Sequence, residues 1–241
     1  MTRRLDGFRQ AGSGLDVLIA VASEVEWRGI AAGFSGPGDQ PAPAPALWTL
    51  ARLGDRTWGV LTGVSKSNAA GGLARVLDPS GHSLVVSLGI AGALPVGGGG
   101  GRVAIGSVVA GAASVFADEG MESRAGWTTM AELGFPVLGG EDAIEADANA
   151  LAAVTDLADA IGTIATVSIC SGSDARAAQI ARRTGAIAEA MEGAAAGMVS
   201  QWLGVGFVEL RVISNVTGDR DRQHWSIAEA LEGLTKLSRE L

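Results

Sequence analysis

The sequence predicts an α/β protein in which helices cover both faces of a largely parallel sheet. Three observations support this prediction. Continuous apolar runs of strand length recur along the chain, segments with helical spacing of Ala and Leu separate them, and 36 glycines suit the turns in between. With 241 residues, 47% of them hydrophobic, the chain can bury one sizeable core. We expect a single domain over residues 15–241 after a polar tail over residues 1–14.

The first elements expected are a strand and a helix. Val17–Ala22 is a continuous apolar run, and Glu24–Phe34 carries helix-like spacing. Residues 48–53 and 57–61 are separated by Gly-Asp-Arg, which suits a tight turn, so they predict a hairpin. A helix over residues 67–77 follows.

The rest of the chain continues the alternation. Strands are expected over residues 83–88, 103–109, 112–116, 161–169, 186–190 and 206–213, and helices over residues 143–160, 174–184, 192–203 and 225–237. In a sheet of this kind, a ligand site lies at the carboxyl ends of the strands. The segments that follow strand ends and carry suitable residues are Glu26, Ile90–Gly92, Ser171–Asp174, Met191–Glu192 and Ser214–Asn215. We expect them to meet at one edge of the sheet.

Charge and cysteine content exclude several classes of protein. The net charge of −8, without a long Lys/Arg cluster, argues against a nucleic-acid partner. The one cysteine, Cys170, excludes an intramolecular disulfide and a multi-cysteine metal site, and its place after a β-branched run predicts a buried thiol. No apolar run approaches the roughly 20 residues that span a bilayer. The first ten residues contain no apolar segment of signal-peptide length, so we expect a cytoplasmic protein without a membrane partner.

Two segments resemble a known family. Met191-Glu192 opens an Ala-rich helix, and a later apolar strand ends in Ser214-Asn215, an arrangement similar to the nucleoside phosphorylase and nucleosidase superfamily. Within it, Ile-Ser-Asn followed by Gly-Asp-Arg-Asp-Arg and Trp225 most resembles the futalosine hydrolase family. The resemblance implies a three-layer α/β/α sandwich with a twisted mixed, largely parallel sheet, no cofactor and no metal, and a homodimer. It also implies hydrolysis of futalosine to dehypoxanthine futalosine and hypoxanthine, in menaquinone biosynthesis.

The implied reaction defines what the site must contain. Breaking the C1′–N9 bond of a purine nucleoside builds positive charge on the sugar and negative charge on the base, so a water activator, sugar anchors and a donor to the base are needed. By resemblance, Glu26 activates the water, and Glu192 and Met191 hold the ribose. The alternative for Glu26 is a place in a solvated first helical turn. The alternative for Met191-Glu192 is an ordinary helix glutamate beside a core methionine. Relatives often carry Glu before this Met, where this chain has Ala190, with Glu189 one step away.

Asn215 distinguishes between purine bases. Relatives that act on adenine nucleosides carry Asp at this place, whereas an Asn amide donates to O6 and N7 of hypoxanthine without being protonated. Ser214-Asn215 is therefore consistent with a 6-oxopurine site, and a simple turn is the alternative. The resemblance also places the backbone of Ile90, Ala91 and Gly92 against sugar and base.

Five further residues are weaker candidates. Ser173-Asp174 resembles the segment that holds the purine, and a helix N-cap is an equal alternative for Asp174. Arg220, Arg222 and Trp225 are expected to bind the tail of futalosine, which ends in a carboxyphenyl group. A surface ion-pair cluster is the alternative for the arginines.

Several other functions stay open. Phosphorylases of the superfamily offer Gly and Arg after the first strand to hold an anion, whereas Ser23-Glu24-Val25-Glu26 would repel phosphate, so water is the expected nucleophile. A phosphorylase, or a nucleosidase of the methylthioadenosine type or for another 6-oxopurine nucleoside, is the nearest alternative. A nucleoside-binding module without catalysis is the alternative from another class. Lys66 is left open between the edge of the site and solvent.

Overall fold

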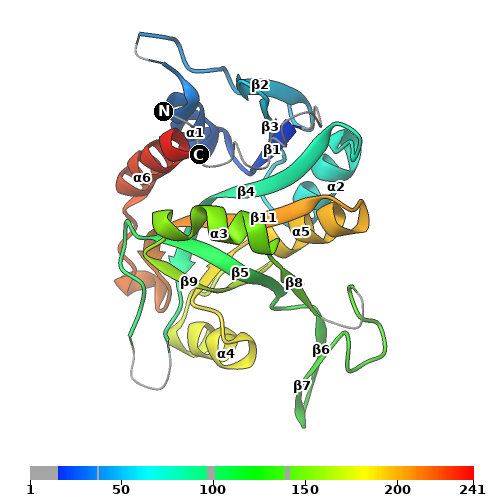
Figure 1. Cartoon of the computed structure of the whole chain (residues 1–241). Coiled ribbons are helices and arrows are strands. Elements are labelled where there is room, and N and C mark those ends of the chain that lie inside the picture. Colours follow the sequence, from blue (N-terminus) through cyan, green and yellow to red (C-terminus); the bar gives the residue numbers. More distant parts are fainter. Residues whose placement is uncertain (1–15, 37, 97–100, 139–141) are drawn as a thin grey trace.

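The computed structural model describes residues 16–36, 38–96, 101–138 and 142–241 (Figure 1). The strands of its large sheet are β1 (Asp16–Val21), β2 (Leu50–Gly54), β3 (Thr57–Leu61), β4 (His82–Ala93), β5 (Val108–Phe116), β8 (Ala143–Glu145), β9 (Ala160–Thr166), β10 (Ala188–Ala190) and β11 (Gly206–Val216). They lie in the order β10-β9-β5-β11-β4-β1-β3-β2, with β8 paired to β5. The tail expected over residues 1–14 falls outside the described residues.

The sheet is mixed, as expected. Parallel pairing joins β3, β1, β4 and β11, and a second parallel group joins β5, β9 and β10. The two groups meet where β11 pairs with β5 in antiparallel fashion. The end of β4 also pairs with β10, so β4, β11, β5, β9 and β10 form a closed ring. This ring determines where the cavity described below can form.

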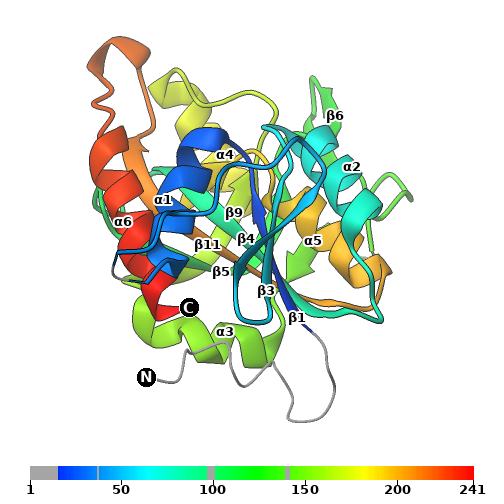
Figure 2. The ribbon, with the colours of Figure 1, turned by 90° about the horizontal axis from the view of Figure 1, so that it is seen from above.

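Helices cover both faces of the sheet, in three layers. The helices are α1 (Glu24–Phe34), α2 (Lys66–Val76), α3 (Ala148–Val154), α4 (Asp174–Thr184), α5 (Gly193–Trp202) and α6 (Ile227–Glu240). Figure 2 shows the sheet between the pair α1 and α6 and the pair α2 and α5. On β1, Val17, Ile19 and Val21 join the core under α1 and α6, while Leu18 and Ala20 join the core under α2 and α5. Because side chains alternate between two buried faces, such strands appear in the sequence as unbroken apolar runs.

Three expectations about the elements were wrong. The helix expected over residues 143–160 is divided, because residues 143–145 pair with β5 and Asp147 then caps the short α3 by accepting from two backbone N–H groups. Of the strands expected over 103–109 and 112–116, residues 103–107 are not in a strand, and the rest belongs to the single strand β5, which has a register shift at Ala112. The small-residue segment after residue 88, expected to be a loop, continues β4 as far as Ala93. Pairing with neighbouring strands decided each case.

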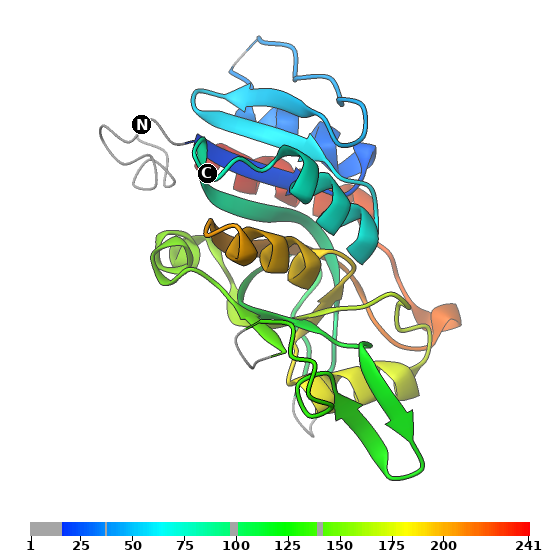
Figure 3. The same ribbon diagram turned by 90° about the vertical axis from the view of Figure 1, so that its right-hand side faces the viewer.

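One element was not expected. The strands β6 (Gly120–Ser123) and β7 (Gly126–Thr129) form a separate hairpin that projects from the body of the molecule (Figure 3). The other helices and the β2–β3 hairpin lie within a few residues of the expected bounds. Within the described ranges, no helix is both long and apolar enough to cross a bilayer.

Candidate active site

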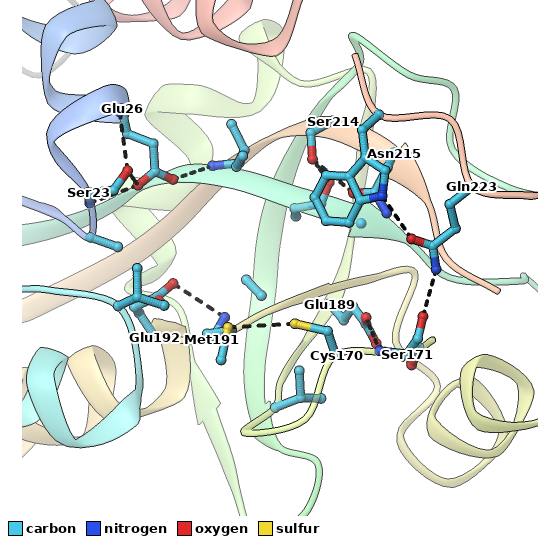
Figure 4. A pocket seen from close by; sticks show the side chains of 18 residues that line it. Ser23, Glu26, Cys170, Ser171, Glu189, Met191, Glu192, Ser214, Asn215 and Gln223 are labelled. Carbon is cyan, nitrogen blue, oxygen red and sulfur yellow. Dashed lines mark hydrogen bonds between the residues drawn. The ribbon is translucent and has the colours of Figure 1, made fainter. Parts of the chain in front are cut away.

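A cavity of about 220 Å³ opens along the edge of β4. On this edge, β4 pairs with β1 as far as Ser87 and with β10 at Gly92, so the backbone between these points faces the cavity. The segments that follow β1 and β10 both reach this gap (Figure 4). The sequence candidates that line the cavity are Glu26, Ile90, Ala91, Gly92, Met191, Glu192, Ser214, Asn215 and Trp225.

Glu26 is fixed in the first turn of α1, with only 6% of its surface exposed. The spacing Ser23-x-x-Glu26 forms a capping box, in which the N–H and the hydroxyl of Ser23 donate to Oε2 of Glu26 at 3.0 and 2.7 Å. Across the gap, the N–H of Ile90 donates to Oε1 at 2.9 Å. The same carboxylate therefore caps the helix and forms part of the cavity wall.

A buried network of charges lies behind Glu192. Arg211, on β11, is 1% exposed, and its Nε lies 2.8 Å from Oε1 of Glu209. Its Nη2 lies 3.5 Å from Oε2 of Glu192 and donates to the Ser87 hydroxyl at 3.0 Å. On the other side, the N–H of Ser65 donates to Oε1 of Glu192 at 3.2 Å. Both oxygens of the Glu192 carboxylate are thus held by neighbouring groups.

Burial and charge determine the protonation of this network. Burial raises the pKa of Glu192 above its ordinary value; Arg211 counteracts this in part, and Glu26 adds to it. Burial alone would lower the pKa of Arg211, but the carboxylates of Glu209, Glu192 and Glu26 raise it above its ordinary value. The arginine is therefore a permanent cation among several acids. A wall of this kind favours a cation that develops in the cavity and repels an anion.

Gly89 allows these charged side chains to approach one another. A β-carbon at this position would overlap with Nη1 of Arg211 and lie 2.5 Å from Oε1 of Glu26. Any other residue would push the two groups apart. The resemblance placed the backbone of the next three residues against sugar and base, and the structure gives a separate reason for a glycine at position 89.

Asn215 lies at the other end of the cavity and is 4% exposed (Figure 4). The Ser214 hydroxyl lies 2.9 Å from Oδ1 of Asn215 and 3.2 Å from the carbonyl oxygen of Ala91. Because the hydroxyl donates to Oδ1, the amide nitrogen Nδ2 remains to donate to a ligand. A shift in the pairing of β11 with β4 between Ile213 and Asn215 marks a bulge, a feature that commonly redirects a side chain beside a site.

Glu189, which the sequence singled out only as lying one step from the place of the relatives' Glu, lines the cavity. It is 6% exposed, and its carboxylate accepts from the N–H and the hydroxyl of Ser171 at 2.7 and 2.6 Å. Burial raises the pKa of Glu189, and these two hydrogen bonds lower it in part. The available signal was a lone charged residue inside the apolar segment 186–190. Gln223 was also missed, because a polar residue in a polar segment carries no pattern.

The prediction for Cys170 was wrong. The strand β9 ends at Thr166, so Cys170 lies in the following segment and not in the sheet. Its side chain is exposed at the cavity, with Sγ 3.6 Å from Sδ of Met191. Partial burial raises the pKa of the thiol, and the charges of Glu189 and Glu192 raise it further. The thiol is therefore held in its neutral form.

The structure places Ser173, Asp174 and Arg222 outside the cavity lining. Ser173 is the N-cap of α4, where its hydroxyl accepts from a backbone N–H. Arg222 forms exposed ion pairs with Asp174 and Asp219. The surface ion-pair alternative therefore describes Arg222, and the cap is Ser173 and not Asp174.

Arg220 and Lys66 are also engaged outside the lining. The guanidinium of Arg220 lies 5.4 Å from the centre of the Trp225 ring, so it reaches the cavity only through that tryptophan. The ammonium group of Lys66 lies 2.7 Å from Asp118 and 2.8 Å from Glu119. Neither residue is among those that line the cavity.

The fold and the cavity define a class of protein. Carboxylates at one end suit a sugar that becomes cationic, and a carboxamide donor at the other suits a base that leaves as an anion. A mixed sheet between helices, with this cavity at the gap in its pairing, is the architecture of a nucleoside phosphorylase or nucleosidase.

Comparisons with known proteins agree. The sequence model of the Phosphorylase superfamily matches residues 45–241. A futalosine hydrolase of Streptomyces coelicolor is 36% identical over 231 residues, which cover 92% of each chain. A futalosine hydrolase of Acidothermus cellulolyticus is 33% identical over 221 residues, which cover 90% of this chain and 86% of the relative. The chain belongs to the Phosphorylase superfamily and, within it, to the futalosine hydrolase family.

A solved structure confirms the fold. An S-adenosylhomocysteine nucleosidase from Streptococcus pyogenes, in complex with 5-methylthiotubericidin, has a TM-score of 0.70 and covers 96% of this chain and 99% of its own. At 20% identity, this likeness concerns the fold alone. The three-layer sandwich expected from the sequence is confirmed.

Proposed function

We propose that this protein hydrolyses the N-glycosidic bond of futalosine to give dehypoxanthine futalosine and hypoxanthine, a step of menaquinone biosynthesis. The observation that carries the proposal is the polarity of one cavity. Glu26 and Glu192 lie at one end, Asn215 lies at the other, and Met191 lies between them (Figure 4). Membership of the futalosine hydrolase family supports the choice of substrate.

The hydrolysis begins with water. A water molecule beside Glu26 attacks C1′, its proton passes to the carboxylate, and the electron pair of the C1′–N9 bond leaves with the base. Ser23 and Ile90 hold the carboxylate from three directions, so a free lone pair has a fixed orientation toward the cavity. Fixed geometry of this kind is what general-base catalysis requires.

The sugar and the base have separate partners. Glu192 accepts hydrogen bonds from the ribose hydroxyls, and the thioether of Met191 packs against the sugar. Asn215 donates from Nδ2 to the hypoxanthine, whose O6 and N7 are both acceptors. The protein then needs no protonated carboxyl to stabilise the departing base.

Water is the nucleophile in this proposal because the sugar end of the cavity is acidic. The cation behind it, Arg211, is already paired with Glu209 and bound to the Ser87 hydroxyl. A phosphate ion entering there would meet Glu26 and Glu192 first, and like charges repel. The dimer and the cytoplasmic location expected from the sequence stay predictions.

The test is hypoxanthine release from futalosine, inosine and methylthioadenosine in phosphate-free buffer, followed by chromatography. Release from futalosine is expected, with a loss of at least about 100-fold in Glu26→Gln. Glu24→Gln is the matched control, because Glu24 lies in the same helical turn but pairs with Arg28 at the exposed surface. Release only after phosphate is added would make the protein a phosphorylase, and no release from any nucleoside would leave a binding module.

A further inference from the structure

Gln223 ties the connection between β11 and α6 to the segment that follows β9. It lies in the β11–α6 connection, residues 217–226, and its side chain lines the cavity. The amide nitrogen donates to the carbonyl oxygens of Ser171 at 2.9 Å and Gly218 at 2.7 Å. The amide oxygen accepts from the indole N–H of Trp225 at 3.0 Å. Both amide hydrogens and the oxygen are therefore used: two contacts lie within residues 217–226, and the third reaches Ser171 after β9.

Trp225 is held by more than this one bond. Its backbone forms a bridge with Asn215, and the next residue, Ser226, donates its N–H to the carbonyl oxygen of Ser214 at 2.8 Å. The guanidinium of Arg220 lies over the indole ring. The backbone is thus tied to the end of β11, while the orientation of the indole depends on Gln223 and Arg220.

We infer that Gln223 is a positioning residue that fixes the indole of Trp225 as a flat wall of the cavity before the substrate enters. Without Gln223, a ring that is 42% exposed could leave the cavity by rotating about its side-chain bonds. The group that packs on this wall is a planar aromatic part of the substrate. Futalosine has two such parts, the purine and the carboxyphenyl tail.

This role predicts which kinetic constant changes. A preformed apolar wall contacts the substrate equally in the ground state and in the transition state, so its loss raises KM and leaves kcat nearly unchanged. A residue with a part in the chemistry would lower kcat instead. The inference rests on the proposed function for its kinetic test, and on hydrogen exchange for a test that needs no substrate.

The kinetic experiment compares Gln223→Met, which keeps the length and apolar volume of the side chain, with the parent. KM for futalosine is expected to rise about fivefold, the worth of one or two neutral hydrogen bonds, with kcat within about twofold. Gln201→Met is the matched control, because Gln201 also donates to a backbone carbonyl, that of Glu145, but lies outside the cavity lining. Unchanged KM, or a fall in kcat alone, would overturn the inference.

A double-variant cycle tests the route through Trp225. Trp225→Phe keeps a ring but removes the donor to Gln223. Its combination with Gln223→Met is expected to raise KM by less than the product of the two single effects, and independent effects would contradict the inference. If these variants raise KM for inosine as well as for futalosine, the purine packs on the wall. If they raise KM for futalosine alone, the carboxyphenyl tail packs there.

The hydrogen-exchange experiment separates the two proposals. In Gln223→Met, the indole N–H of Trp225 is expected to exchange faster than in the parent, because it has lost its acceptor and the ring is free to turn toward solvent, while the helices stay protected. Faster exchange in a protein that releases no base would refute the proposed function and retain the positioning role. Unchanged exchange in a protein that hydrolyses futalosine would refute only the positioning role.

Discussion

Replacing Arg211 by Met removes the one cation of a buried network and leaves its acids unpaired. Arg211 is 1% exposed and lies 2.8 Å from Glu209 and 3.5 Å from Glu192. At an effective dielectric constant of about 20, these distances correspond to attractions of roughly 6 and 5 kcal/mol. The cost of burying the guanidinium offsets much of this, and breaking a buried pair from one side costs about 3–5 kcal/mol in practice.

The expected loss in free energy of unfolding is large enough to measure and small enough to leave a folded protein. Domains are stable by about 5–15 kcal/mol. For a chain of this size, each kcal/mol lowers Tm by about 2–4 °C, so Arg211→Met should lower Tm by about 6–20 °C. Calorimetry or circular dichroism on the parent and the variant gives this difference directly.

The pH dependence of the loss has a definite sign. Removing Arg211 takes away the group that counteracts the raised pKa of Glu192. A raised carboxyl pKa in the folded state costs stability as pH rises through that pKa, because the ionised form is the one the fold disfavours. The gap in Tm between parent and variant should therefore be wider at pH 8 than at pH 5.

Two further variants complete the test. Arg28→Met is the control, because Arg28 forms a surface pair with Glu24 and its side chain is 75% exposed, so little change in Tm is expected. Adding Glu209→Gln to Arg211→Met removes one unpaired charge and should recover part of the loss. A loss in Arg211→Met no larger than in Arg28→Met would refute the reasoning.

Three other outcomes are expected. Asn215→Asp should lower kcat for hypoxanthine release about 100-fold, the cost of losing one well-placed donor, and should permit adenine release from methylthioadenosine; chromatography of both bases checks this, and unchanged base preference would contradict it. Gly89→Ala should lose about 1–3 kcal/mol of stability and most activity, because its β-carbon would separate Arg211 from Glu26; a Tm equal to that of the parent would contradict the packing. If Glu192 must be ionised to bind the ribose, kcat/KM should fall at low pH, with an apparent pKa above the ordinary 4.5 of a glutamate. A fall centred at or below 4.5 would count against this role.

Patterns in neighbouring residues explain most of what the sequence predicted. Val17–Val21 forms a buried strand because both faces of β1 are covered. The helix cap at Ser23-x-x-Glu26 was not predicted, although it too depends only on neighbouring residues. Glu209 and Arg211 are two apart on one strand and so share a face, which makes their pairing a local feature too. The bounds of β4 and the division of residues 143–160 could not be predicted this way, because pairing with other strands set them.

The sequence by itself determined most of the helices and strands of the large sheet, though not β8 or the β6–β7 hairpin, and it supplied the carboxylate of Glu26 and the carboxamide of Asn215. Each depends on backbone periodicity or on contacts within a few residues. Only the tertiary structure decided that Gly89 must admit two charged groups, that Ser171 holds Glu189, and that the amide of Gln223 reaches the carbonyl oxygen of Ser171. Those contacts join residues far apart in the chain, so they exist only where packed strands and helices bring the side chains within hydrogen-bond distance.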